Sequence, residues 1–513
     1  MARSLLNHSV LIALGLGFAS AIGCSGGGTT GTGSTGAGGV GGAGDTTSSA
    51  TSTSTSAATS AASTSASSST SASSSTTGGT GGMGSTSAAG TGGMGTGGAT
   101  ASSSAGTGGD PNDVDNDADG WSVNEGDCCD VPGNCDTPAL VNPGAFEYLG
   151  NGVDDDCDPS TLDNVVPVDC APPALTTPTS SDDLIKAMDL CQTTTLLAPK
   201  PMKKWGVIHT DLLLADGTSV VGPNGLQIAP TGLQIGVLAK YGSNVTPRKG
   251  PTMAAISSGS ARAVGDVGYV HPQNGTLMGQ NGNYDAKSKV GVPALWLGAH
   301  NGVVPSPGNC PVCSDATCAQ AFDSVNLKAQ IRVPTNAKSF SYSFKFYTAE
   351  YPEFVCQQYN DFFITLLETT WKPASAKACL MGPECESGTC TGGMCVKAAP
   401  LPADANIAFD AAKNAVSVNN GFFEVCFPAV NAPPGACPSG TFDLVGTGMG
   451  GWGNNLKDGG GTEWLINDAP VVPGETMVIQ FVTWDAGDHN VDSLVLLDKF
   501  RWNVTPSLPG VHK

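Results

Sequence analysis

The residues between 25 and 109 limit what this chain can fold into more than any other stretch. They contain no aromatic, Ile, Leu, Lys or Arg side chain and consist almost entirely of Gly, Ser, Thr and Ala. Such a segment has too little apolar surface to offset the entropy lost when a backbone becomes ordered. We therefore predict a disordered tether over residues 24–109, with a root-mean-square span of roughly 50 Å, and expect the folded structure to follow it.

Cys24 stands where an apolar N-terminal segment meets this tether. Arg3 supplies a positive charge, residues 10–22 are mostly apolar, and Ala21-Ile22-Gly23-Cys24 is typical of a bacterial lipoprotein processing site. The apolar run is too short to span a bilayer. We predict a signal peptide over residues 1–23 and lipidation of Cys24. The lipid would be the contact with the outer membrane, with the chain exposed at the cell surface; without lipidation the protein would be secreted.

The charge of the chain bears on its partners. Its formal value is −21, from 23 basic and 44 acidic side chains. Phosphate binding requires clustered Lys or Arg, and no such cluster is visible, so we exclude a nucleic-acid partner. Residues 110–163 contain many Asp and Glu but no Lys or Arg. An uncompensated acidic segment of this kind favours a bound cation.

The 17 cysteines point to an oxidising compartment. If Cys24 carries lipid, an even number remains, which suits complete pairing in disulfides. Zinc is the alternative for two groups of cysteines. These groups are Cys310, Cys313 and Cys318, and Cys379, Cys385, Cys390 and Cys395. We favour disulfides because the chain has the features of an exported protein, and we expect the four-cysteine group to form a small disulfide knot.

The region after the acidic segment is predicted to be mainly β. Residues 339–346 alternate between aromatic and polar side chains, which indicates a strand with one buried and one solvated face. Further strands are expected at residues 204–214, 232–238, 361–367, 415–418, 476–484 and 493–502. Helical spacing over residues 182–191 predicts one short helix. We predict an antiparallel, jelly-roll-like β-sandwich over residues 165–513.

Residues 113–120 contain a carboxylate at every second position and end in a glycine. Alternate carboxylates can converge on one hard cation, and the glycine permits the sharp turn, as in the first half of a calcium loop. With Asp115 at ligand position one, Gly126 falls at position twelve, where an EF-hand has Glu, so we predict a calcium loop of another type. The alternative is a solvated acidic spacer. The predicted calcium ligands are Asp113, Asp115, Asp117, Asp119, Glu125, Asp127, Asp154, Asp155, Asp156 and Asp158.

Residues 115–158 resemble the Asp-rich metal-binding motif that occurs in secreted bacterial proteins. These proteins include the methanotroph surface copper-binding family. The likeness rests on Gly126-Asp127-Cys128, Pro143-Gly144-Ala145-Phe146-Glu147 and the run from Asn151 to Asp158. Tyr148 replaces a cysteine that is usual in the family, and Cys129 and Cys135 are additional. A segment of this size has little core, so metal and disulfides would have to stabilise it.

A second resemblance lies within residues 344–363. Glu350-Tyr-Pro-Glu353-Phe followed by Asn360-Asp361-Phe-Phe resembles the signature of the choice-of-anchor L domain of bacterial surface proteins. Supporting motifs occur in the family's order at Gln234-Ile-Gly-Val, Ser257-Ser-Gly259, Asn406-Ile-Ala408, Asp485-Ala-Gly-Asp488 and Asp492-Ser493. The resemblance implies a domain joined to a surface anchor and implies no enzymatic activity.

The same motifs supply a second acidic group. If the two loops that contain it meet at one end of the sandwich, its carboxylates repel unless a cation or hydrogen bonds intervene. A second calcium site would use Glu350, Glu353, Asp361, Asp485, Asp488 and Asp492. The alternative, which we favour, is that Asp485 and Asp488 form Asx turns and that Glu350 or Glu353 pairs with a basic residue such as Arg501.

Three functions remain open from the sequence. The first is a non-catalytic, calcium-stabilised surface lipoprotein that binds a surface protein or polysaccharide in adhesion or matrix contact. The second is a carbohydrate-binding module with a platform of Trp452, Trp464, Trp484 and Trp502. The third is a glycoside hydrolase that uses Glu350 and Glu353 as its acid and base. The chain contains no His-Glu-x-x-His motif, and its Gly-x-Ser-x-Gly match, residues 23–27, lies at the predicted lipoprotein processing site rather than on the strand-to-helix turn of a serine hydrolase.

Overall fold

The computed structural model describes most of residues 110–513, and residues 101–513 belong to one compact unit. Within 110–513, the residues outside the description are 132, 134, 162, 165–169, 171, 173, 175–179, 220–231, 273–288, 309, 313–315, 376, 383–384, 386, 388, 420–421, 429–434 and 452–455. The expected signal peptide, Cys24 and the tether also lie outside the described residues. Among the helices that are described, none has the length and apolar character needed to cross a lipid bilayer.

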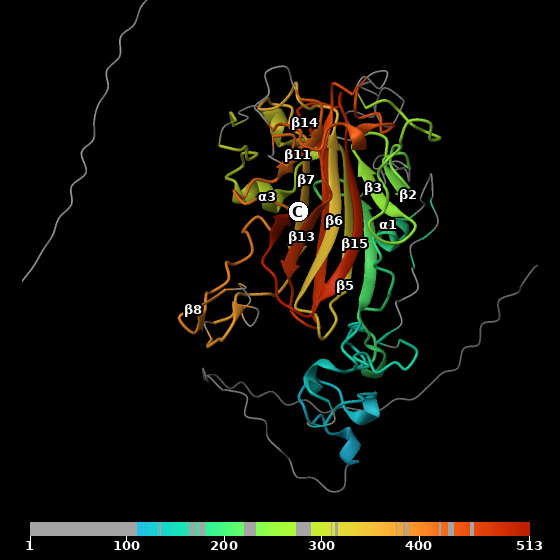
Figure 1. The fold of residues 1–513 in the computed structure, drawn as a ribbon, viewed down its shortest axis with the longest axis vertical. Helices are drawn as coiled ribbons and strands as arrows, with labels where there is room; N and C mark the ends of the chain where they lie inside the picture. Colours follow the sequence, from blue (N-terminus) through green and yellow to red (C-terminus); the bar gives the residue numbers. More distant parts are fainter. Residues whose placement is uncertain are drawn as a thin grey trace, which may run out of the picture. The chain divides into compact units, whose positions relative to one another are not determined.

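Two antiparallel sheets form the body of the fold (Figure 1). The first has the strand order β1-β5-β14-β7-β10, with β4 beside β5. Its strands are β1 Gly206–Leu213, β4 Val290–Gly291, β5 Gln320–Arg332, β7 Phe362–Glu368, β10 Val416–Ser417 and β14 Thr476–Ala486. The central pairs join segments that are far apart in the sequence, as expected of a sandwich with long crossover connections.

The second sheet has the order β11-β12-β6-β15-β3-β2, with β13 beside β6 and β16 beside β13. Its strands are β2 Ile235–Leu238, β3 Met253–Ser257, β6 Ser339–Thr348, β11 Phe423–Cys426, β12 Gly460–Thr462, β13 Leu465–Pro470, β15 Ser493–Asn503 and β16 Gly510–His512. The antiparallel β-sandwich predicted from the sequence is confirmed.

The main hydrophobic core lies between these sheets. Phe340, Tyr342, Phe344 and Phe346 of β6 are almost fully buried and belong to one apolar cluster with residues of β5, β7 and β14. The rings of Tyr342 and Phe481 meet edge to face with their centroids 5.1 Å apart. The aromatic face predicted for residues 339–346 is therefore confirmed.

The opposite face of β6 is not solvated, so that part of the prediction is wrong. Ser343 and Lys345 are buried, and Tyr347 joins a second apolar cluster with residues such as Met253, Leu444 and Leu494. Lys345 is fully buried and pairs with Asp443 and Glu463. Long connecting segments cover this face and supply both the apolar contacts and the acidic partners, which local alternation does not reveal.

Helices are short in this fold. The α-helices are α1 Ser181–Ala187 and α3 Ala294–Ala299. The 3-10 helices are η1 Pro111–Asp113, η2 Val123–Glu125, η3 Pro138–Leu140, η4 Lys200–Met202, η5 Ala316–Ala319 and η7 Phe442–Leu444. The predicted helix at 182–191 is confirmed as α1, which Ser180 caps by accepting a hydrogen bond from Asp183 N. It ends before Asp189, whose φ of 68° is left-handed.

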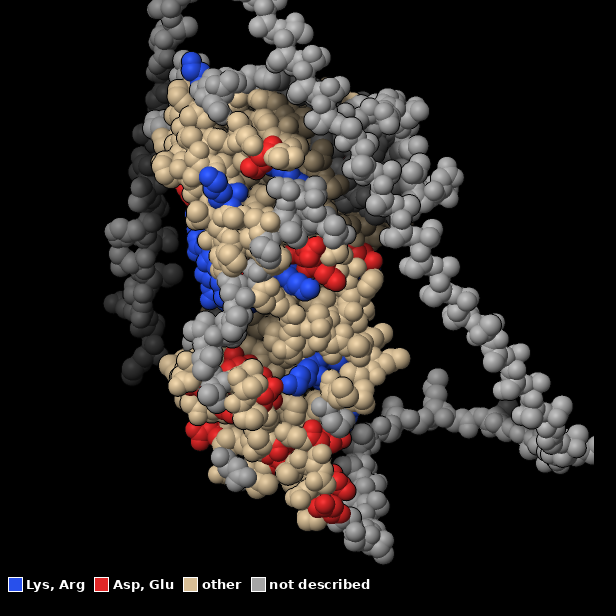
Figure 2. Space-filling view, turned by 90° about the vertical axis from the view of Figure 1, so that its right-hand side faces the viewer, with Lys and Arg blue, Asp and Glu red and all other residues tan. Residues whose placement is uncertain are grey.

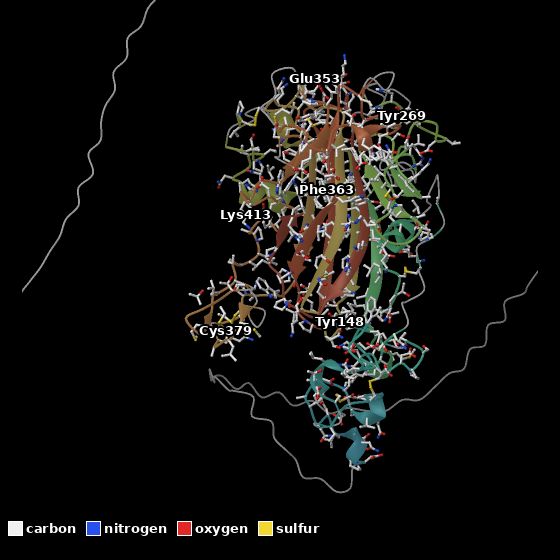
Figure 3. All side chains as sticks on the ribbon, viewed as in Figure 1. Tyr148, Tyr269, Glu353, Phe363, Cys379 and Lys413 are labelled. Atoms are coloured by element: carbon white, nitrogen blue, oxygen red, sulfur yellow. A yellow bond between two sulfur atoms is a disulfide. The ribbon has the colours of Figure 1, made fainter. Side chains whose placement is uncertain are left out.

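Every described cysteine is in a disulfide. The bridges are Cys128–Cys157, Cys129–Cys135, Cys170–Cys191, Cys310–Cys356, Cys379–Cys390, Cys385–Cys395 and Cys426–Cys437, and Cys318 is also bonded. Cys313 lies outside the described residues. The predicted disulfide knot is confirmed around the hairpin of β8 Cys390–Thr391 and β9 Met394–Cys395, where Figure 3 labels Cys379. The zinc alternative is wrong for this group, because a disulfide sulfur is not a thiolate ligand.

We expect Phe344→Ala to lower the free energy of unfolding by about 3–5 kcal/mol, because it leaves a cavity between the two sheets. Leu197→Ala is the control, since Leu197 is 90% exposed and its truncation should change stability by less than about 0.5 kcal/mol. Urea unfolding of the oxidised chain measures both. Similar losses for the two variants would contradict the assignment of the core.

Candidate metal sites

The acidic segment, residues 110–163, consists of turns and 3-10 helices held by Cys128–Cys157 and Cys129–Cys135. It contacts the turn between β5 and β6 through backbone and amide groups. Phe146 N donates to Asn336 Oδ1 at 3.0 Å, and Asn336 Nδ2 donates to Phe146 O at 2.8 Å. Figure 2 shows acidic side chains gathered at this end of the described region. The segment is therefore attached to the sandwich while it concentrates negative charge.

The first carboxylate cluster joins Asp115, Asp117, Asp119, Asp127 and Asp130. One oxygen each of Asp115, Asp117 and Asp130 lies within 4.8 Å of the others, and the same holds for Asp117, Asp119 and Asp127. Asp117 belongs to both groups, so the two groups form one continuous cluster. This is the convergence that the alternating carboxylates predict.

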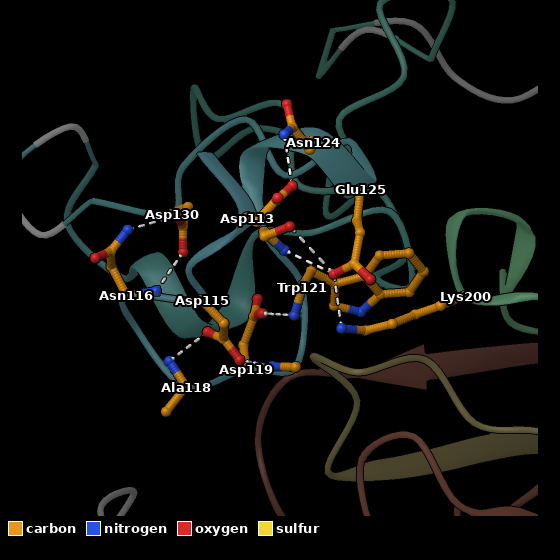
Figure 4. Close-up of polar contacts among 12 residues, drawn as sticks. Asp113, Asp115, Asn116, Ala118, Asp119, Trp121, Asn124, Glu125, Asp130 and Lys200 are labelled. Atoms are coloured by element: carbon orange, nitrogen blue, oxygen red, sulfur yellow. Dashed lines mark hydrogen bonds and ion pairs between the residues drawn. The ribbon is translucent and has the colours of Figure 1, made fainter. Parts of the chain in front are cut away.

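Local hydrogen bonds set the shape of this loop, as Figure 4 shows. Asp115 accepts from Ala118 N at 2.7 Å and from Gly120 N at 2.9 Å, and Asp119 accepts from Trp121 N at 2.8 Å. Gly120 has a φ of 97°, a conformation that favours glycine. The backbone therefore turns sharply around the carboxylates.

Two carboxylate oxygens of the first cluster lack a partner. Asp117 Oδ2 and Asp127 Oδ2 are buried and make no hydrogen bond. Burial is the main cause that raises the pKa of Asp119 and of Asp127 to about 6, and neighbouring Asp charges add to it. An unpaired, buried carboxylate oxygen is unfavourable unless a proton or a cation satisfies it.

A second cluster in the same segment joins Glu147, Asp154 and Asp156, with one oxygen of each within 4.8 Å of the others. Asp155 N donates to Glu147 Oε2 at 2.9 Å, while Glu147 Oε1 and Asp154 Oδ1 are buried without a partner. Burial, followed by the charges of nearby Asp residues, raises the pKa of Glu147 to about 7. This cluster has the same unsatisfied acceptors as the first.

Four of the predicted ligands lie outside both clusters. Asp113 accepts from Asn124 Nδ2 at 2.7 Å, and Glu125 caps η2 and pairs with Lys200 at 2.6 Å (Figure 4). Asp155 accepts from Tyr148 N, and Asp158 pairs with Lys204. These acids already have donors within the protein.

Two members of the clusters were missing from the predicted set of ligands. Asp130 follows the extra Cys129 outside the alternating run, and Glu147 lies in the Pro143–Glu147 motif that carried the family resemblance. The family resemblance could therefore have identified Glu147 as a candidate ligand. For Asp130 the local sequence gave no such indication, because this residue lies outside the alternating run and its carboxylate is held by Asn116, 14 residues earlier, whose backbone N and Nδ2 donate to it.

The second acidic group of the sequence lies inside the sandwich. Glu350, Asp361, Asp485 and Asp492 are each at most 3% exposed. Asp361 accepts from Ala486 N at 3.2 Å and from Ser493 Oγ at 2.5 Å, while Glu350 accepts from Asp361 N at 3.3 Å. The structure thus brings together the two loops that the sequence placed at one end of the sandwich.

The other two members of this group lie at the surface. Glu353 is exposed at one end of the sandwich, where Figure 3 labels it, and its neighbour is Asp458 rather than Glu350. Asp488 accepts from Asn490 N at 3.0 Å, which is the predicted Asx turn. The predicted pair with Arg501 does not form, because Arg501 is exposed on β15 opposite Ser341.

The tryptophans predicted as a carbohydrate platform do not form an exposed surface. Trp484 is fully buried and stacks on Phe362 with centroids 5.1 Å apart, and Trp502 is 7% exposed. Trp464 is half-buried against the second apolar cluster. Trp452 lies outside the described residues. The strand positions of Trp484 and Trp502 face the core, which is the usual place for large apolar side chains.

No protein-family model, curated protein or solved structure matches this chain. The features that bear on function are therefore the two clusters of the acidic segment and the interior group.

We expect the metal-free chain to become less stable as the pH rises from about 5 to about 7.5. The raised pKa values of Asp119, Asp127 and Glu147 mean that the folded state binds more protons than the unfolded state between roughly pH 4 and 7, so the free energy of unfolding falls across that range.

Thermal unfolding of chain freed of metal by chelation and desalting measures this dependence. Glu147→Gln should flatten it. A melting temperature that rises over the same pH interval would contradict the raised pKa values of these acids. So would a pH dependence of the melting temperature that Glu147→Gln leaves unchanged.

Proposed function

We propose that this protein is a non-catalytic surface lipoprotein in which a calcium-binding segment connects a lipid-anchored tether to a β-sandwich. The observation that carries the proposal is the pair of carboxylate clusters with buried, unpartnered oxygens, such as Asp117 Oδ2 and Glu147 Oε1. A divalent cation would supply the partners that these oxygens lack.

Calcium fits the donor set better than a softer metal. The clusters consist of carboxylates, and the neighbouring sulfurs of Cys128 and Cys157 are joined in a disulfide. Hard oxygen donors suit Ca²⁺ or Mg²⁺, whereas thiolate and imidazole favour zinc or copper. The irregular loop geometry favours Ca²⁺, because Mg²⁺ requires a nearly ideal octahedron.

A bound cation would stabilise a segment that has little core of its own. Its described buried apolar side chains include Trp121, Val141 and Ala145, and two disulfides supplement them. The segment precedes the sandwich in the chain and follows the tether, so a load on the sandwich would pass through it to the lipid. Calcium and disulfides would hold that connection together.

The sandwich is, in this proposal, the part that contacts a surface protein or a polysaccharide, as the resemblance to the choice-of-anchor L domain suggests. Glu350 is buried and Glu353 is exposed beside Asp458. This placement does not give the facing pair of carboxylates that a glycoside hydrolase uses.

Calcium should raise the melting temperature of the oxidised chain, by an amount that corresponds to about 2.7 kcal/mol when free calcium is 100 times the dissociation constant. The triple variant Asp117→Asn, Asp127→Asn, Glu147→Gln should lose most calcium binding in this segment. The control, Asp113→Asn with Glu125→Gln, removes two acids that lie outside the clusters and should bind calcium as the unmodified chain does.

Calorimetric titration with calcium, run beside thermal unfolding, separates these outcomes. Equal loss of binding in the triple variant and the control would contradict the assignment of the clusters, and an unmodified chain that binds no calcium would refute the proposal.

Lipidation of Cys24 is tested by Cys24→Ser. The unmodified chain should incorporate labelled fatty acid in a Gram-negative host and sediment with the outer membrane, whereas the variant should carry no label and remain soluble. A variant that stays in the membrane fraction would show that another segment anchors the protein.

A further inference from the structure

Four aspartates lie inside the sandwich at the same end of the two sheets. Asp323 is in β5, Asp361 directly precedes β7, Asp485 is near the end of β14, and Asp492 directly precedes β15. Each is at most 3% exposed. Asp323, Asp361 and the pair Asp485 and Asp492 come from three separate parts of the chain, and antiparallel pairing brings their strand ends together.

Strand register and hydrogen bonds place these three parts of the chain in contact. Asp485 lies opposite Phe322, the neighbour of Asp323, just after a register shift in the β5–β14 ladder. Asp361 contacts both ends of the β14–β15 connection, because its carboxylate accepts from Ala486 N and from Ser493 Oγ. The fold therefore brings the segments that carry the aspartates together, and the charges of Asp361, Asp492 and Asp323 all act on Asp485.

Gly259 leaves the space that the side chain of Asp492 occupies in this group. A Cβ built on Gly259 would lie 1.9 Å from Asp492 Oδ2, so the carboxylate of Asp492 occupies the space that a side chain would need. The adjacent Ser258 accepts and donates around the start of β15, where Ser493 N donates to Ser258 Oγ at 2.9 Å. Backbone and small residues thus fit closely around Asp492.

Asp485 is the observation that points to a ligand. It is 2% exposed, and neither of its carboxylate oxygens has a hydrogen-bond partner. Among the described residues, Asp361, Asp485 and Asp492 form no ion pair with Lys, Arg or His. The buried Lys345, in contrast, has two acidic partners. A buried carboxylate without a donor or a counter-charge is strongly unfavourable.

We propose that Asp361, Asp485 and Asp492, with Asp323, bind a divalent cation, calcium by their all-oxygen chemistry, inside the sandwich. This site is separate from the two clusters of the acidic segment and uses none of their residues. The ion would tie the ends of β7, β14 and β15 to β5 and so connect the two sheets.

Protons are the competing explanation for the same group. Burial, with a smaller contribution from the charge of Asp488, raises the pKa of Asp361 to about 7. Burial and the charges of neighbouring acids, Asp323 and Asp361 among them, raise the pKa values of Asp485 and Asp492. Without a cation, neutral acids could share hydrogen bonds in the interior. The two explanations differ in whether the folded chain retains calcium at neutral pH.

The first experiment measures calcium bound per chain by equilibrium dialysis and metal analysis at neutral pH. The full, oxidised chain carries Asp117→Asn, Asp127→Asn and Glu147→Gln, so that the acidic segment contributes little. We expect this background to retain about one calcium ion. Adding Asp485→Asn should remove that ion, and adding Asp211→Asn, a surface control on β1, should not. Because the background is measured first, its failure to bind calcium would overturn the interior site whatever the interior variants do.

The second experiment compares melting temperatures with calcium and with chelator. In chelator, Asp485→Asn should melt at a higher temperature than its background, because it removes one of the repelling acids. In calcium the order should reverse, because the variant has lost the ion. Equal melting temperatures of the background in calcium and in chelator would show that protons, not a cation, neutralise the group. Neither result depends on calcium in the acidic segment, which the unmodified chain and the triple variant test separately.

Discussion

Carboxylates that lie close together without basic partners impose the main constraint on this structure. They occur in the two clusters of the acidic segment and in the interior group around Asp361 and Asp485. Like charges at short range raise the free energy of a folded state unless protons or cations neutralise them. Disulfides and sheet pairing bring these acids together, so the stability of the fold depends on what neutralises them.

The sandwich also contains a buried positive charge that has partners of opposite charge. Lys345 extends from β6 into the outer face of the second sheet, where Asp443 and Glu463 come from other segments to pair with it. The same connecting segments add apolar residues such as Leu444, so this sheet is buried on both faces. The charge of Lys345 is thus balanced by acids of the protein itself, whereas the carboxylate of Asp485 has no hydrogen-bond partner.

Much of the fold could be predicted from local patterns. The alternation in residues 339–346 indicated β6 and its inward aromatic face, and the helical spacing of residues 182–191 indicated α1, which ends at Ala187. The central strand β5 was missed although residues 325–331 alternate, because its Asn and Lys positions are interspersed with short apolar side chains and both its faces contact other elements. Local sequence does not report which polar positions a distant segment will cover.

For the candidate sites, the sequence by itself determined which residues could act, through the alternating acids of 113–120 and the absence of basic residues in 110–163, while the number of cysteines predicted an oxidising compartment. These follow from composition and short spacing. Tertiary structure decided which acids converge. It placed Asp113 and Glu125 beside donors within the protein, added Asp130 and Glu147 to the clusters, and gathered four interior aspartates from three separate parts of the chain. Only the folded path determines such distances, because disulfide pairing and strand register act over separations that no local pattern encodes.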